Sequence, residues 1–206
     1  MSLRINTKLS QLVVLFLTLT GCQYDTPRQH DDICQILDTN IGWYYAAKQS
    51  SDKWGIPIAL QLAIIQRESG FTPHARTQQE WLFGIIPWGR ESTSYGYSQA
   101  INATWDEFIK KNKYSYAFRN SFWDATDFIG WYLNEAHKRA DIHKYDAKNL
   151  YLAYHVGIVG FNRKDYESDP KLVKIAEEVT QRAIDYQRQL KVCEPELDRY
   201  WYYPIF

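Results

Sequence analysis

Apolar residues recur at steps of three and four along most of the chain after residue 32, and this spacing is the period of an α-helix. The pattern predicts a first helix over residues 33–53, which Gly55 ends. A second helix is expected to begin at Pro57 and to end near Ser69, with Gly70 as its C-cap. Four more helices are expected over residues 103–111, 121–139, 147–155 and 170–190. The pattern therefore predicts a mainly α-helical protein.

Residues with known cap preferences mark several of these helix ends. Ser121 and Asp124 form a capping-box-like start for the helix that follows them. The Asp169-Pro170 pair is a typical start for the last helix, because proline is tolerated in the first turn. Gly157 and Gly160 are expected to stop the helix before them.

The segment between the second and third predicted helices has no sustained hydrophobic period. Residues 71–97 contain several glycines and prolines, and also an apolar stretch with Trp81 and Trp88. Irregular loops of this length are usually functional or disordered, and the apolar content favours a function. We expect the loop to pack along a groove or against a membrane, with a small hairpin possible around residues 81–97.

The first 21 residues have the pattern of an export signal. A basic start is followed by an apolar run over residues 12–19, which is too short to span a bilayer. The run ends at Leu19-Thr20-Gly21-Cys22, which resembles the lipobox of bacterial lipoproteins. That resemblance implies acylation of Cys22 and, because Gln23 follows it, an anchor on the periplasmic face of the outer membrane. An ordinary secretory signal with an incidental cysteine is the alternative interpretation.

The rest of the chain divides into a tether, a domain and a tail. Residues 22–32 are polar and cannot bury a face, so they are expected to be a tether. Residues 33–193 contain no repeat or low-complexity tract and are long enough for one domain with its own core. Residues 194–206 end in an aromatic run, which we expect to pack on the domain, on lipid or on a partner.

Charge and ligand spacing exclude two classes of function. The 24 Lys and Arg residues balance 24 Asp and Glu residues, so a nucleic-acid-binding surface has no support. His74, His137 and His143 lack metal-ligand spacing, and we expect neither a metal nor a cofactor. The 8 Trp and 16 Tyr residues suit both an aromatic core and a groove that stacks on sugar rings, and composition does not separate these.

Two cysteines lie in the domain, Cys34 near its start and Cys193 near its end. In an oxidising compartment they most simply form a disulfide, and two buried free thiols are the alternative. A bridge would close nearly the whole domain into one loop. In the chain-entropy model, such a loop stabilises the fold by roughly 4 to 5 kcal/mol.

Three short segments in a fixed order carry a family resemblance: Glu68-Ser69, Gly96-Tyr97-Ser98-Gln99 and Ala153-Tyr154-His155-Val156-Gly157. Together they resemble the signature of the lytic transglycosylases, the lysozyme-like enzymes that cut bacterial cell-wall glycan. The resemblance covers roughly residues 55–160. It implies a mainly α, lysozyme-like domain of the SLT or goose type that binds peptidoglycan strands.

The resemblance assigns the chemistry to Glu68. Cleaving a glycosidic bond requires a carboxylic acid that stays protonated near neutral pH. A helix C-terminus and an apolar cleft both disfavour a carboxylate, so we expect the pKa of Glu68 to be raised. For an isolated Glu-Ser pair, a surface glutamate paired with Arg67 or Arg76 is the simpler interpretation.

The second and third segments are expected to support the site. The resemblance implies that Gly96 lets the backbone approach the sugar and that Gln99 binds its polar groups, with Tyr97 and Ser98 between them. It also implies that the hydroxyl of Tyr154 reaches the catalytic carboxyl and orients it. A core tyrosine on an ordinary helix is the alternative.

Two further positions have an expected part in the site. His155 stands where the family has asparagine, and it could donate a hydrogen bond to substrate while adding a titrating group. Ser69 resembles a family serine that holds the substrate N-acetyl group or the carboxyl. A hydroxyl that bonds a carbonyl of its own helix is the alternative for Ser69.

Many glycosidases use a second carboxylate, and this sequence names none. Asp106, Glu107, Asp124 and Asp127 lie on predicted helices, where capping or solvated positions account for them. The resemblance implies that Glu68 acts alone on the β-1,4 bond between N-acetylmuramic acid and N-acetylglucosamine and forms a 1,6-anhydromuramyl end. A hydrolysing muramidase on the same fold and a non-catalytic glycan-binding envelope lipoprotein are the alternatives.

Overall fold

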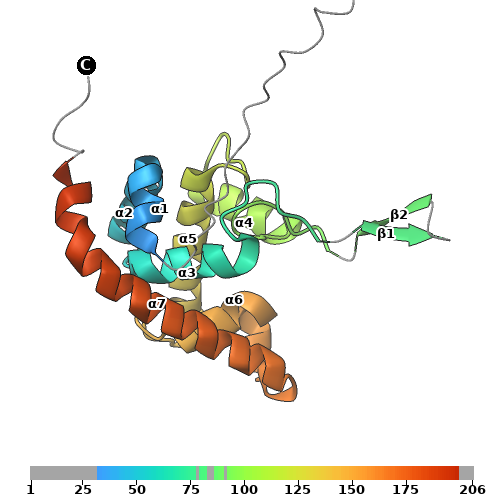
Figure 1. The fold of residues 1–206 in the computed structure, drawn as a ribbon. Coiled ribbons are helices and arrows are strands. Elements are labelled where there is room, and N and C mark those ends of the chain that lie inside the picture. The colour runs from blue at the N-terminus through green and yellow to red at the C-terminus, as the bar shows by residue number, and fades with distance from the viewer. Residues whose placement is uncertain (1–31, 78, 83–85, 91, 200–206) are drawn as a thin grey trace, which may run out of the picture.

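The computed structural model describes residues 32–77, 79–82, 86–90 and 92–199, which form a mainly helical domain with one small hairpin (Figure 1). A short 3-10 helix, η2 (Asp165–Ser168), precedes the last α-helix. The α-helices are α1 (Ile33–Thr39), α2 (Ile41–Trp54), α3 (Ile58–Ser69), α4 (Asn102–Asn112), α5 (Phe122–Ala140), α6 (Ala147–Asn162) and α7 (Pro170–Leu197). The predicted fold class is therefore confirmed.

The helix predicted over residues 33–53 is in fact two helices, so that prediction is wrong at one point. Asn40 separates α1 from α2 with φ −130° and ψ 63°. Its side-chain amide donates to the carbonyl of Ile36 at 3.2 Å. Asparagine competes with the helix for backbone hydrogen bonds, and here it ends α1 in this way.

Other helix ends follow their cap residues. The hydroxyl of Ser121 accepts from the backbone N–H of Asp124, as the capping-box-like pattern predicts. The Asp169 carboxylate accepts from the N–H groups of Lys171 and Leu172 at the start of α7. The last helix extends to Leu197, seven residues beyond its expected end, so the first residues of the proposed tail belong to α7.

The core lies where α5 packs against α2 and α6, and where α7 lies along α1, α3 and α6 (Figure 1). The Cys34–Cys193 disulfide is present and joins α1 to α7, which confirms the proposed pairing. Close to it, Gln189 of α7 accepts from the backbone N–H of Ile33 at 2.8 Å. A disulfide and a hydrogen bond therefore connect the first and last helices of the domain.

A hairpin interrupts the chain between α3 and α4. Strands β1 (Gln79–Leu82) and β2 (Ile86–Arg90) pair antiparallel, with an irregularity in register between Glu80 and Trp81. The hairpin that the sequence allowed in this loop is therefore confirmed. Figure 1 shows it beside the helical body.

Several predictions fall outside the described residues or side chains. They concern the signal and Cys22 at residues 1–31, the side chains of Trp81 and Trp88, and the aromatic run at residues 200–206. They stay predictions. Among the residues that are described, no helix combines the length and the apolar character that crossing a membrane requires.

Candidate active site

Helix α3 places Glu68 at the boundary between the core and a cavity. Its middle is fully buried through Leu62, Ile64 and Ile65, which fixes its position in the domain. Gly70 ends the helix in the left-handed conformation, φ +55°, as its C-cap. Glu68 therefore lies in the last turn, where the chain leaves the core.

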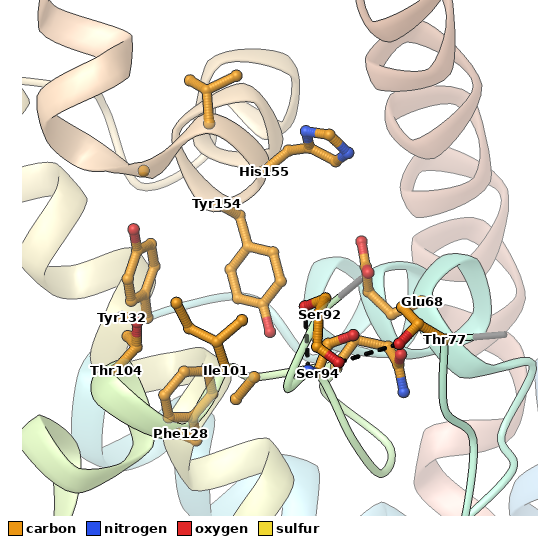
Figure 2. Close-up of a pocket in the computed structure, with 14 residues that line it drawn as sticks. Glu68, Thr77, Ser92, Ser94, Ile101, Thr104, Phe128, Tyr132, Tyr154 and His155 are labelled. Atoms are coloured by element: carbon orange, nitrogen blue, oxygen red, sulfur yellow. Dashed lines mark hydrogen bonds between the residues drawn. The ribbon is translucent and has the colours of Figure 1, made fainter. Parts of the chain in front are cut away.

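A cavity of about 510 Å³ opens beside Glu68. Figure 2 shows that side chains from α3, α6 and the segment after the hairpin converge on it. Of the described residues that line the cavity, Glu68 is the only carboxylate. The lining residues are Glu68, Thr77, Ser92, Ser94, Gln99, Ala100, Ile101, Thr104, Phe128, Tyr132, Tyr154, His155, Val156 and Gly157.

Burial raises the pKa of Glu68 to about 7, in the direction that the sequence predicts. Two smaller effects oppose this rise, a hydrogen bond from Tyr151 and the positive charge of Arg67. The alternative of a surface ion pair with Arg67 or Arg76 is not what the geometry shows. No ion pair joins Glu68 to either arginine within the described part of the chain. Near pH 7, the neutral and the ionised carboxyl of Glu68 are therefore present in about equal amounts.

The prediction that the Tyr154 hydroxyl contacts the carboxyl of Glu68 is wrong, because a different tyrosine makes that contact. The hydroxyl of Tyr154 donates to the backbone carbonyl of Ser98 at 2.6 Å. The hydroxyl that contacts Glu68 Oε1, at 3.1 Å, belongs to Tyr151, one turn earlier on α6. Tyr154 still lines the cavity with Glu68, so both side chains face the same site (Figure 2).

Sequence reasoning missed Tyr151, although the helical period contains a signal for it. Tyr151 precedes Tyr154 and His155 by three and four residues, and residues at these spacings share one face of a helix. If residues 154 and 155 belong to the site, this periodicity also places Tyr151 beside them. The family pattern does not indicate Tyr151, because that residue lies outside the matched segment.

Gly96 allows a close backbone approach, and the approach that the structure shows is to another part of the protein. Its φ is +78°, and a Cβ there would lie 2.0 Å from the carbonyl oxygen of Arg119. The same carbonyl accepts from the N–H of Tyr97 at 3.1 Å. The glycine thus lets the segment after the hairpin pack directly on the chain before α5.

Of the other residues of the Gly96–Gln99 segment, one lines the cavity and two are buried behind its wall. Gln99 lines the cavity, and its side-chain nitrogen donates to the carbonyls of Ala75 and Gly96 at 3.0 and 2.7 Å. Among the described residues its amide oxygen has no hydrogen-bond partner, and such an oxygen can accept from a ligand. Tyr97 and Ser98 are buried behind the wall. The structure therefore brings Gln99 to the cavity but not the side chains of residues 97 and 98.

Replacing Gly96 with alanine is expected to lower the free energy of unfolding by about 2 to 3 kcal/mol, because the new Cβ meets the Arg119 carbonyl and the left-handed φ becomes strained. Urea unfolding measures the change. Gly42→Ala is the matched control, since Gly42 lies within α2 and a Cβ added there would meet no atom within 4 Å. A Gly96→Ala protein as stable as the control would contradict this packing.

The structure also shows the environment of three further positions that the sequence singled out, which are His155, Ser69 and Gly157. His155 lines the cavity, and burial of its ring lowers its pKa, so it is neutral near pH 7. The hydroxyl of Ser69 donates to the carbonyl of Ile65 at 3.0 Å, which is the alternative given for that serine. Gly157 interrupts α6 with φ +79°, but the helix resumes after it, so the predicted stop at residue 157 is a kink.

The other candidate carboxylates have structural partners. Asp127 pairs with Lys53, Glu107 with Lys111, and Asp124 accepts from the N–H of Phe118. None of these carboxylates, nor Asp106, lines the cavity. Over residues 32–199, leaving out the undescribed positions, no group of three His, Cys, Asp or Glu side chains could hold a metal ion.

Comparison with known families agrees with this geometry. A family model described as the transglycosylase SLT domain matches residues 10–193, which is most of the chain. The protein belongs to the transglycosylase SLT domain family. No curated protein and no solved structure gives a significant match to the chain.

Membership of the SLT domain family confirms the resemblance carried by the three segments. It supports a transglycosylase-type activity and the binding of peptidoglycan. In the SLT domain of this chain, the first segment supplies Glu68, the second supplies Gln99, and the third supplies Tyr154 and His155 to one cavity. The hydroxyl groups of Thr77, Ser92 and Ser94, which no motif predicted, complete a wall suited to polar sugar groups.

Proposed function

We propose that the protein is a peptidoglycan lytic transglycosylase that cleaves the β-1,4 bond between N-acetylmuramic acid and N-acetylglucosamine and leaves a 1,6-anhydromuramyl end. The observation that carries the proposal is the carboxyl of Glu68, with a pKa of about 7, in a cavity with no other carboxylate among its described lining residues. A single acid that changes protonation state near neutral pH suits a reaction in which one group first gives and then takes a proton.

In the proposed reaction, the neutral Glu68 donates its proton to the glycosidic oxygen as the bond from that oxygen to the muramyl C1 breaks. The carbonyl oxygen of the substrate N-acetyl group stabilises the positive charge that develops at C1. The Glu68 carboxylate then takes the proton of the muramyl C6 hydroxyl, and the C6 oxygen forms the new bond to C1. Glu68 ends the cycle protonated, and no water is consumed.

The pH dependence of cleavage is expected to follow the protonation of Glu68. Because the first step needs the neutral acid, kcat/KM should fall as pH rises through about 7. An acid with the ordinary pKa of 4.5 would lose activity more than two pH units lower. Initial rates of muropeptide release from purified sacculi between pH 4 and 9 measure this fall in kcat/KM, which is the alkaline limb of the pH profile. A limb near pH 4.5 would contradict a buried, neutral acid.

The masses of the released muropeptides test the proposed product. Transglycosylation yields muramyl ends that are one water lighter than reducing ends and that borohydride does not reduce. Release of reducing ends instead would show the second candidate, a hydrolysing muramidase on the same fold. Binding to sacculi without any release would favour a glycan-binding envelope lipoprotein.

We also propose that the protein is a lipoprotein, acylated at Cys22 and held at the periplasmic face of the outer membrane. The proposal rests on the Leu19-Thr20-Gly21-Cys22 segment, the polar tether after it and a peptidoglycan substrate that lies in the same compartment. Labelling of cells with an alkyne fatty acid should mark the wild-type protein and not Cys22→Ala. Equal labelling of both proteins would exclude acylation at this residue.

A further inference from the structure

Two tyrosines one helical turn apart on α6 have separate partners at the site. The Tyr151 hydroxyl donates to Glu68 Oε1 at 3.1 Å, whereas the Tyr154 hydroxyl donates to the Ser98 carbonyl at 2.6 Å. Tyr151 is itself buried, which raises the pKa of its hydroxyl, and the positive charge of Arg67 on α3 acts in the opposite direction. Tyr151 and Glu68 are therefore joined by a hydrogen bond, and the charge of Arg67 acts on both groups.

We propose that Tyr151 is the positioning residue of the catalytic carboxyl, and that Tyr154 serves instead to hold the wall segment that carries Gln99. The inference deepens the proposed function and rests on it in one respect, namely that Glu68 is the acid. It departs from the family resemblance, which places the orienting hydroxyl at residue 154.

The contact also determines which carboxyl oxygen reacts. The hydrogen of the Tyr151 hydroxyl lies between that hydroxyl and Glu68 Oε1, so there is no room for a second hydrogen on Oε1 in the same contact. The proton of the neutral acid therefore resides on Oε2. Tyr151 occupies one oxygen and leaves the other for substrate. When Glu68 gives up its proton, the same hydrogen bond stabilises the carboxylate that forms.

The charged and titratable groups that face Glu68 come from two helices. Arg67 on α3 lowers the pKa of Glu68, and Tyr151 on α6 lowers it by hydrogen bonding. Tyr154 and His155, also on α6, line the same cavity, and both are neutral near pH 7 because burial raises the pKa of the tyrosine and lowers that of the histidine. Arg67 and Tyr151 are therefore the two groups that favour the ionised form of the acid.

Matched Tyr→Phe variants of the full chain separate the two tyrosines. Tyr151→Phe is expected to lower kcat about tenfold with little change in KM, and to move the alkaline limb of kcat/KM upward by about one pH unit. Tyr154→Phe is expected to raise KM and to leave the limb in place. Tyr116→Phe, at a side chain that is 83 % exposed, is the control and should match the wild type in all three quantities.

Arg67→Met is a further variant that tests whether the alkaline limb reports the titration of Glu68, because the charge of Arg67 lowers the pKa of that residue. Arg67 is exposed, so its replacement leaves the core intact, and the limb should again move to higher pH. A limb that moves in Tyr154→Phe and stays fixed in Tyr151→Phe would overturn the proposal. A limb that moves in Arg67→Met and stays fixed in both tyrosine variants would also overturn it, because it would show that Tyr151 only packs.

A readout independent of turnover distinguishes this inference from the proposed function. The side-chain carboxyl carbon of 13C-labelled glutamate reports the titration of Glu68 directly, with Glu68→Gln identifying its resonance. The proposal predicts a higher pKa in Tyr151→Phe than in the wild type and no change in Tyr154→Phe. A protein that releases no muropeptides would count against the proposed function, and the resonance would still decide between the two tyrosines.

Discussion

Replacing Glu68 with glutamine is expected to lower muropeptide release from purified sacculi by about a thousandfold or more. Glutamine has nearly the same shape but cannot donate a proton to the leaving oxygen or take one from the C6 hydroxyl, and general acid-base catalysis contributes about 10² to 10⁴ to such rates. No other carboxylate among the described lining residues could take over. Glu178→Gln, at an exposed position on α7, is the matched control and should retain full activity.

The same substitution is expected to stabilise the fold at alkaline pH, which separates a lost catalyst from a damaged protein. The folded pKa of Glu68 lies above its unfolded value, so its contribution to stability is present at low pH and is lost as pH rises through about 7. A displacement from 4.5 to about 7 corresponds to about 3 kcal/mol. Relative to the wild type, Glu68→Gln should therefore gain stability between pH 4 and pH 9. Retained cleavage activity, or a loss of stability over this range, would contradict the account.

Removing the Cys34–Cys193 disulfide is expected to give the largest loss of stability, about 4 kcal/mol. The bridge joins residues 159 apart, so it restricts the unfolded chain over nearly the whole domain. Urea unfolding of Cys34→Ser/Cys193→Ser against the wild type measures the loss, and the wild type with a reductant should approach the double variant. A difference below about 1 kcal/mol would show that the contacts between α1 and α7 hold these helices without the bridge.

Unlike its stability, the catalytic activity of the disulfide variant is expected to change little. The disulfide joins α1 to α7, and neither cysteine lines the cavity that holds Glu68. At a temperature where the double variant is folded, its kcat/KM on sacculi should therefore remain within about twofold of the wild type, because distant sites rarely couple by more than a few tenths of a kcal/mol. A large loss of activity in a folded variant would connect the α1–α7 contact to the site.

The helices could be predicted because their apolar spacing is local information. The starts at Ser121 and Asp169 follow from side chains that cap their own helix, and both caps are present. The break at Asn40 could not be predicted, because asparagine is tolerated within a helix and only its actual conformation shows that it divides α1 from α2. Gly157 was placed correctly as an interruption, but the backbone resumes a helix after it.

The site could be predicted only as far as single segments determine it. The position of Glu68 follows from its place in the last turn of an apolar helix, and its raised pKa follows from burial. Whether Tyr151 or Tyr154 contacts the carboxyl depends on how α6 is rotated against α3, which is a property of tertiary packing. The partner of Gly96 could not be inferred either, because Arg119 is distant in the sequence.

Digestion of sacculi in water enriched in 18O is the most direct test of the central claim, that Glu68 directs cleavage without water. A reducing end formed by hydrolysis takes its C1 oxygen from water and therefore becomes labelled, whereas the C1 of an anhydro end is bonded to the substrate's own C6 oxygen and stays unlabelled. The account predicts anhydromuramyl ends that contain no 18O and that disappear in Glu68→Gln. Muramyl ends that contain 18O and lack the anhydro bond would contradict it.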